Sequence, residues 1–180
     1  MSQPKEPMPA KLIVGLLFHD FDVQLQALES LSRRFGPMDF LSDPRRFSYT
    51  SYYEREMGPE LYRQTGSFVE LVRPETLPDI KLFTNDIESR LSADGKRRVN
   101  IDPGLLSEER LILATGKNYT HRIYLRDGIY ADLTLMYQDG AYRAFPWTYP
   151  DYRDSTLLGY LGALRNTLRF QRSGKLPRKG

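Results

Sequence analysis

The segment from His121 to Phe145 places ionisable side chains within sequence that otherwise has the apolar and aromatic pattern of strands. Asp127-Gly128 and Asp139-Gly140 are residue pairs that tolerate a positive φ at both central positions of a two-residue turn. Apolar and aromatic residues flank both pairs in strand-like order. The segment therefore predicts a three-stranded antiparallel meander, and its polar residues are candidates for chemistry.

The register of this meander decides which polar side chains share a face. If both loops contain two residues, Ile123 pairs with Asp132 and Met136 pairs with Arg143. The polar residues collected on that face are His121, Asp132, Thr134 and Arg143. Because one face of a sheet usually packs on the core, these charges must be paired or must line a cleft.

Asp132 lies diagonal to His121 in this register, close enough to orient the imidazole or to raise its pKa. One hypothesis is a general acid-base pair, with Arg143 or Arg122 holding an anion. The alternative is a cross-strand hydrogen bond on a solvated face, which would contribute to stability alone.

The segment after the meander concentrates aromatic and charged residues, including the single tryptophan. An aromatic loop of this kind either forms a lid over a cleft or fills a small core beneath itself. It could also stack nucleic-acid bases. Together with the meander, this loop gives a predicted ligand-binding site made of His121, Arg122, Asp132, Arg143, Trp147, Tyr149, Asp151 and Arg153.

A second polar cluster, His19, Asp20 and Asp22, follows the first apolar run and could hold a divalent metal ion. Capping of a helix by Asp20 or Asp22 explains both carboxylates without a metal, and we favour it. We therefore predict no metal site, and the sequence does not identify a cofactor.

The motifs of familiar nucleotide and hydrolase sites are missing. A phosphate loop needs Gly, four residues and then Gly-Lys-Ser/Thr, but Asn118 follows Gly116-Lys117 and Leu111 replaces the first glycine. Neither G-x-G-x-x-G nor G-x-S-x-G occurs. An anion site of another kind could use Lys81, Asn85, Lys117 or Arg122.

Composition favours one domain in a reducing compartment. The chain has 180 residues, 40% of them hydrophobic, and no cysteine, so we expect a cytoplasmic location. The longest apolar run, Leu12 to Phe18, is too short to cross a bilayer, and we expect no membrane passage. We predict a flexible segment at 1–10, one globular domain at 11–170 and a flexible basic tail at 171–180.

The last sixteen residues contain six basic and no acidic side chains, namely Arg165, Arg169, Arg172, Lys175, Arg178 and Lys179. Removing these six from the 26 basic residues leaves 20 against 23 acidic residues, so the rest of the chain is slightly acidic. Such a tail could bind nucleic acid or simply remain solvated.

Hydrophobic periodicity predicts the elements that must position these residues. Apolar stripes at helical spacing indicate helices at Asp22–Phe35, Thr76–Leu91 and Ser155–Phe170. Apolar or β-branched runs indicate strands at Lys11–Phe18, Tyr49–Glu56, Ser67–Val72, Arg98–Ile101 and Leu111–Ala114, with a turn at Asp102-Pro103-Gly104. We expect a single α+β domain with a twisted, mostly antiparallel mixed sheet and about three helices packed on it.

Several segments taken together resemble a known bacterial family. They are Tyr52–Gly58, Lys81–Asn85, Asn100–Gly104, His121–Leu125 and Trp147–Tyr152. The chain from about Lys11 to Arg169 resembles a bacterial domain-of-unknown-function family whose members are often labelled GTP-binding proteins. The resemblance implies no established activity and assigns no role to a residue.

Two functional hypotheses follow from the residues. The first is a cytoplasmic binding protein or enzyme for a small anionic ligand bearing phosphate or carboxylate, in a cleft lined by the predicted site. The alternative is a nucleic-acid or protein interaction module that uses the basic tail and exposed aromatic residues. The sequence does not indicate the oligomeric state.

Overall fold

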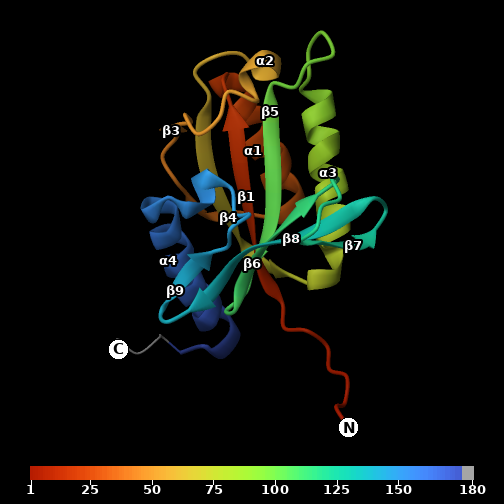
Figure 1. Cartoon of the computed structure of the whole chain (residues 1–180), viewed down its shortest axis with the longest axis vertical. Coiled ribbons are helices and arrows are strands. Elements are labelled where there is room, and N and C mark those ends of the chain that lie inside the picture. Colours follow the sequence, from red (N-terminus) through yellow and green to blue (C-terminus); the bar gives the residue numbers. More distant parts are fainter. Residues whose placement is uncertain (176–180) are drawn as a thin grey trace.

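The structure is a computed structural model that describes residues 1–175, within which it contains nine strands and four α-helices (Figure 1). The strands are β1 (Ala10–Phe18), β2 (Met38–Leu41), β3 (Arg45–Arg46), β4 (Tyr62–Val72), β5 (Val99–Leu106), β6 (Arg110–Thr115), β7 (Arg122–Arg126), β8 (Ile129–Gln138) and β9 (Ala141–Ala144). The helices are α1 (Phe21–Phe35), α2 (Glu54–Met57), α3 (Leu77–Arg90) and α4 (Ser155–Ser173), with 3-10 turns η1 (Pro74–Thr76) and η2 (Pro150–Arg153).

All nine strands belong to one sheet, which confirms the predicted α+β class. The strand order is β2-β4-β1-β5-β6-β8-β7, with β3 added to β4 and β9 added to β8. Each strand pair in residues 1–175 is antiparallel. The three long helices match the three predicted ones, and α2 adds a single turn.

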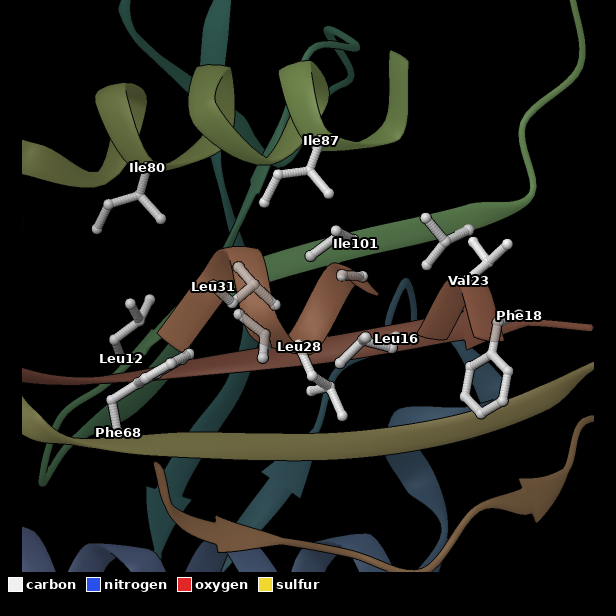
Figure 2. Packing of buried hydrophobic residues seen from close by; sticks show 13 residues of the cluster. Leu12, Leu16, Phe18, Val23, Leu28, Leu31, Phe68, Ile80, Ile87 and Ile101 are labelled. Carbon is white, nitrogen blue, oxygen red and sulfur yellow. The ribbon is translucent and has the colours of Figure 1, made fainter. Parts of the chain in front are cut away.

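Strand β1 lies at the centre of the sheet and is buried along its whole length, as its continuous aliphatic run predicts. Its side chains alternate between two cores. Leu12, Val14, Leu16 and Phe18 join α1 and α3 on one face, and Figure 2 shows Ile80 and Ile87 of α3 pointing toward this cluster. Ile13 joins α4, β6, β8 and β9 on the other face. The sheet is therefore covered by helices on both sides.

Strand β5 continues through Asp102-Pro103-Gly104, so the turn predicted there is wrong. Proline lacks an N–H and is tolerated in a strand where no ladder bond is needed. Ile101 directs its N–H and C=O away from β1, and Pro103, two residues on, faces the same edge. Strand β6 pairs with β5 only from Gly104 onward, so the missing N–H of Pro103 costs no sheet hydrogen bond.

Helix α3 replaces a strand along this open edge of β5. The Ile101 N–H donates to Glu88 Oε1 at 2.7 Å, and Lys81 Nζ donates to the Ile101 carbonyl at 2.9 Å. Both side chains are buried, and their own charges lie 3.8 Å apart. Lys81 thus bonds to the Ile101 carbonyl and lies beside the Glu88 carboxylate. These contacts favour a structural role for Lys81 over the anion-binding role considered from sequence.

The predicted strand at Tyr49–Glu56 is also wrong, because this segment forms turns followed by α2. One of its tyrosines, Tyr53, packs into a small cluster, whereas Tyr49 and Tyr52 are exposed. Tyr53 and Phe47 pack against the buried Leu17, Met57 and Leu61. Strand β4 starts at Tyr62, five residues before the predicted strand, and pairs with β1 on one side and with β2 and β3 on the other.

The predicted meander exists, but the register of its first hairpin is wrong by one residue. Asp127 and Gly128 have φ values of 53° and 75°, so the two-residue turn is present. An irregularity at Leu125 then shifts the ladder, and Arg122 instead of Ile123 pairs with Asp132. The second hairpin has the predicted pairing of Met136 with Arg143.

Helix α4 extends to Ser173, three residues into the segment predicted as a flexible tail. Lys11 Nζ donates to Gln171 Oε1 at 3.1 Å, and Arg172 donates to the carbonyl of Pro9. These contacts tie the end of α4 to the start of β1. Arg178 and Lys179 of the predicted tail lie outside the described residues. In the described part of the chain, every helix is too short or too polar to cross a lipid bilayer.

Replacing Glu88 tests whether α3 closes the edge of β5. Glu88→Ala leaves the buried Ile101 N–H without its acceptor and should lower the free energy of unfolding by about 1–3 kcal/mol in urea denaturation. Glu88→Gln keeps an acceptor oxygen and should lose less. Glu29→Ala, which removes an exposed ion pair with Arg33 on α1, is the control and should cost about 0.5 kcal/mol or less. Equal losses for Glu88→Ala and Glu29→Ala would contradict this role.

Candidate functional site

Asp132 of β8 is the centre of the cluster predicted from the meander. His121 Nε2 lies 3.2 Å from Asp132 Oδ2, and Arg122 Nε donates to the same oxygen at 2.8 Å. Thr134 Oγ1 lies 3.3 Å from the other carboxylate oxygen. The predicted contact between His121 and Asp132 is present, and the shifted register adds Arg122 to it.

Arg122 uses all three of its guanidinium nitrogens within the protein. Besides the bond to Asp132, Nη1 donates to the Lys117 carbonyl at 3.0 Å and Nη2 donates to the Tyr149 hydroxyl at 2.9 Å. The side chains of His121, Arg122 and Asp132 are 10%, 9% and 6% exposed. This cluster is internally satisfied, which favours the structural alternative over an anion site.

Trp147 packs against the His121 end of this cluster. Its ring stacks on His121 with centroids 5.0 Å apart, and Phe145 stacks on it at 4.8 Å. The indole Nε1 donates to the Leu133 carbonyl at 2.9 Å. Because the indole ring already stacks on two side chains, less of its surface is left to stack a nucleic-acid base, although Trp147 is 40% exposed.

The other predicted site residues do not join this cluster. Arg153 donates to the carbonyls of Phe145, Pro146 and Thr148 and so holds the loop in shape. Arg143 is exposed on β9, opposite Met136. Asp151 lies elsewhere, in the wall of a separate pocket.

This pocket lies between the β3 segment, β4 and the start of α4, and has a volume of about 270 Å³. Three arginines and several hydroxyl groups line it together with two carboxylates. The lining residues are Ser42, Arg45, Arg46, Ser48, Tyr49, Arg63, Thr65, Asp151, Asp154, Leu157 and Tyr160. Such a mixture of guanidinium and hydroxyl donors fits an anionic group.

Arg63 of β4, which lines the pocket, is held by three partners from two elements, β5 and η2. Its Nη1 donates to Asp102 Oδ2 of β5 at 3.0 Å, and its Nη2 lies 3.2 Å from Asp151 Oδ2 and donates to the Tyr152 hydroxyl at 3.0 Å. Its buried Nε has no hydrogen-bond partner among the described residues. The guanidinium is thus held in position through Nη1 and Nη2, while its Nε–H has no partner among the described residues.

Gly15 of β1 makes room for this arrangement. A Cβ atom at position 15 would lie 2.8 Å from Arg63 Nη2 and 3.1 Å from the Tyr152 hydroxyl, closer than normal packing allows. Gly15 pairs with Thr65 on one side and Asp102 on the other. A glycine inside a buried strand therefore allows the Arg63 side chain to cross β1 and reach Asp102.

The two carboxyl groups that share Arg63 have pKa values shifted in opposite directions. Burial and the nearby Asp102 raise the pKa of Asp151 above its ordinary value, although Arg63 opposes this. Burial also acts to raise the pKa of Asp102, but Arg63 and Lys81 outweigh it and hold that pKa below its ordinary value. Paired carboxyl groups separated in this way are typical of sites that handle protons.

The rim of the pocket carries more weakly held charges. Arg45 Nη1 lies 3.1 Å from Asp154 Oδ1, and Arg46 Nη2 lies 2.5 Å from Glu60 Oε1. The two arginine side chains are 54% and 65% exposed. Exposed ion pairs of this kind contribute little to stability. An anionic ligand could therefore replace Asp154 or Glu60 as the partner of a rim guanidinium.

Sequence reasoning missed this pocket, apart from Asp151. Arg63 lies before the strand predicted at Ser67–Val72, and Asp102 lies in the segment predicted as a turn. The available signal was Gly15, since an isolated glycine inside an aliphatic strand often marks a close approach of another group.

The remaining sequence candidates have structural partners. Asp20 caps α1 by accepting from the N–H groups of Asp22 and Val23, as favoured, and it also binds Arg98. Within residues 1–175, no group of three or more His, Asp or Glu side chains is arranged to hold a metal ion. The basic residues Arg165, Arg169 and Arg172 all lie within 4 Å of Glu108. Nucleic-acid binding through the tail stays a prediction.

Comparison with known proteins gives one match. Residues 8–168 match the family model described as Domain of unknown function (DUF4416), which covers most of the chain. No curated protein and no solved structure matches the chain.

Gly15→Ala tests the packing beneath Arg63. The added methyl group should displace the guanidinium from its partners and lower the free energy of unfolding by about 1–3 kcal/mol in urea denaturation. Gly159→Ala, on the exposed side of α4 with nothing within 4 Å of a new Cβ, is the matched control. It should stabilise the protein by about 0.5–1 kcal/mol. A neutral Gly15→Ala variant would show that the close approach is unimportant.

The opposite pKa shifts predict opposite pH dependence for two variants. The lowered pKa of Asp102 means that its carboxylate stabilises the fold above pH about 4 and loses this contribution as pH falls. The raised pKa of Asp151 means that its contribution is present below pH about 4 and is lost as pH rises through its native value. When pH is raised from about 3 to about 7, which brackets the ordinary pKa of an aspartate, the stability deficit of Asp102→Asn should grow and that of Asp151→Asn should shrink. Thermal melts across this range measure both, and parallel curves would contradict the assignment.

Proposed function

Because the chain belongs to the DUF4416 family, whose description assigns no activity, we propose a function from the pocket: the protein binds a small anionic ligand bearing phosphate or carboxylate. The observation that supports this most is the convergence of Arg45, Arg46 and Arg63 on one pocket of about 270 Å³. Guanidinium groups bind both kinds of anion through paired, charge-assisted hydrogen bonds.

The rim arginines would make the first contact with the anion. They are mostly exposed, and their ion pairs with Asp154 and Glu60 can be exchanged for a ligand at little cost. Ser48 and Tyr49, in the same wall, add hydroxyl donors. The charge of Arg63 is compensated by Asp102 and Asp151, so the two rim arginines supply most of the attraction for the anion.

The volume of the pocket limits the ligand. Typical small-molecule sites occupy about 300–1,000 Å³, so this pocket of about 270 Å³ lies just below that range. A small metabolite with one or two anionic groups fits better than a whole nucleotide. The proposal includes a cytoplasmic location, which rests on the cysteine-free composition.

A thermal-shift panel tests the proposal. It should include inorganic phosphate, sugar phosphates, dicarboxylates, divalent metal ions and nucleotides, with GTP among them. A ligand at 100 times its dissociation constant stabilises the native state by about 2.7 kcal/mol and should raise the melting temperature by roughly 5–10 °C.

The Arg46→Gln variant tests whether the anion binds in this pocket. It should weaken the anion found in the panel by about 10-fold to 100-fold, because a charge-assisted hydrogen bond is lost. Arg33→Gln is the matched control, since Arg33 is also exposed and pairs with one carboxylate at 2.5 Å, but lies on α1 on the opposite face of the sheet. Equal affinities of the two variants, or no shift with any anion, would refute the proposed pocket.

A further inference from the structure

Two carboxylates line the pocket, and they differ in how fully their oxygens are used. Asp154 Oδ1 accepts from the N–H groups of Thr156 and Leu157 and pairs with Arg45, while Oδ2 lies 3.4 Å from the Tyr49 hydroxyl. Asp154 is therefore occupied as the cap of α4 and as the anchor of the rim.

Asp151 also lines the pocket, and its carboxylate has fewer partners than that of Asp154. Its Oδ2 pairs with Arg63 Nη2 at 3.2 Å, and a carboxylate has roughly four lone-pair sites. The η2 turn fixes the backbone of Asp151, since the Tyr152 N–H donates to Tyr149 and the Asp154 N–H donates to the Asp151 carbonyl. The side chain is thus a rigid, 11% exposed acceptor in the pocket wall.

The charged groups around Asp151 determine which kind of ligand group can bind beside it. A second anionic group would be repelled by the carboxylates of Asp151 and Asp102. An ammonium group would lie next to Arg63, which already contacts the same carboxylate. A neutral O–H donor meets neither repulsion, and it satisfies the acceptor that the pocket offers.

Resting on the proposed function, we infer that the ligand is a hydroxylated anion, whose anionic group binds the rim arginines Arg45 and Arg46 and whose hydroxyl group donates to Asp151. The chemical class is a small hydroxy acid or a polyol phosphate. Arg63 acts as a positioning residue, because it holds the Asp151 carboxylate between β4 and the loop before α4.

Matched probes that differ in one group test this inference. Isothermal titration should compare succinate, malate and aspartate, and likewise propyl phosphate and glycerol 3-phosphate. In whichever series binds, the hydroxylated member should bind about tenfold or more tightly than the member without the hydroxyl, as expected for a hydrogen bond to a charged group. Aspartate should bind no more tightly than succinate.

Two variants assign the preference to a residue. Asp151→Asn should reduce the preference for the hydroxylated probe to less than about threefold, because a neutral amide oxygen is a weaker acceptor. Asp154→Asn, which changes the other pocket carboxylate and retains a good helix-capping residue, should keep the preference. If Asp151→Asn does not fold, the ratios measured for the natural protein still decide whether a hydroxyl is recognised.

Each other outcome has a definite meaning. Equal affinities for succinate and malate, with both bound, would overturn the hydroxyl inference and leave the anion site intact. Tighter binding of aspartate would overturn it in favour of an ammonium group. A preference retained in Asp151→Asn would remove Asp151 from the role. No binding by any probe of either series would overturn both the inference and the proposed function.

Discussion

The pocket depends on the Arg63 side chain, which passes over Gly15 and bonds to Asp102 and Asp151. One guanidinium group joins β4 to Asp102 of β5 and to Asp151 and Tyr152 of the η2 turn. It can do so because the strand between β4 and β5 has no side chain at that position. The same contacts fix the loop before α4, and α4 then covers this face of the sheet. The contacts of Arg63 therefore hold both the start of α4 and the wall of the pocket in place.

Two ionisable clusters, one around Asp132 and one around Arg63, differ in how many of their polar atoms have hydrogen-bond partners. Around Asp132, the nitrogen atoms of Arg122 are bound within the protein and the Trp147 ring stacks on His121 and Phe145. Around Arg63, one buried donor lacks a partner and the rim arginines are mostly solvated. A ligand gains most where protein groups still have hydrogen-bonding capacity and their existing pairs are weak. This difference is why the function is proposed for the pocket.

Most of the fold was predictable from local patterns, and the errors have physical causes. The aliphatic run of β1 and the helical stripes of α1, α3 and α4 need only periodicity to be recognised. The segment Asp102-Pro103-Gly104 has a strong turn composition, but it lies in a strand whose edge is closed by the side chains of α3. The aromatic residues of 49–56 suggest a strand, yet the segment forms turns and its Tyr53 packs against Leu17. In both cases a tertiary contact outweighed the local preference.

The sequence by itself determined the α+β class, the three long helices, the capping of the first helix by Asp20 or Asp22, the meander turns and the proximity of His121 to Asp132. Each of these depends on residues close together in the chain or on a simple period. Only the tertiary structure decided that Asp151 belongs with Arg63 and Asp102, and that Arg45 and Arg46 stand beside them. These residues are separated by as many as 106 positions, from Arg45 to Asp151. They meet because β4, β1 and β5 are neighbours in the sheet and α4 packs across them, and no local pattern specifies that order.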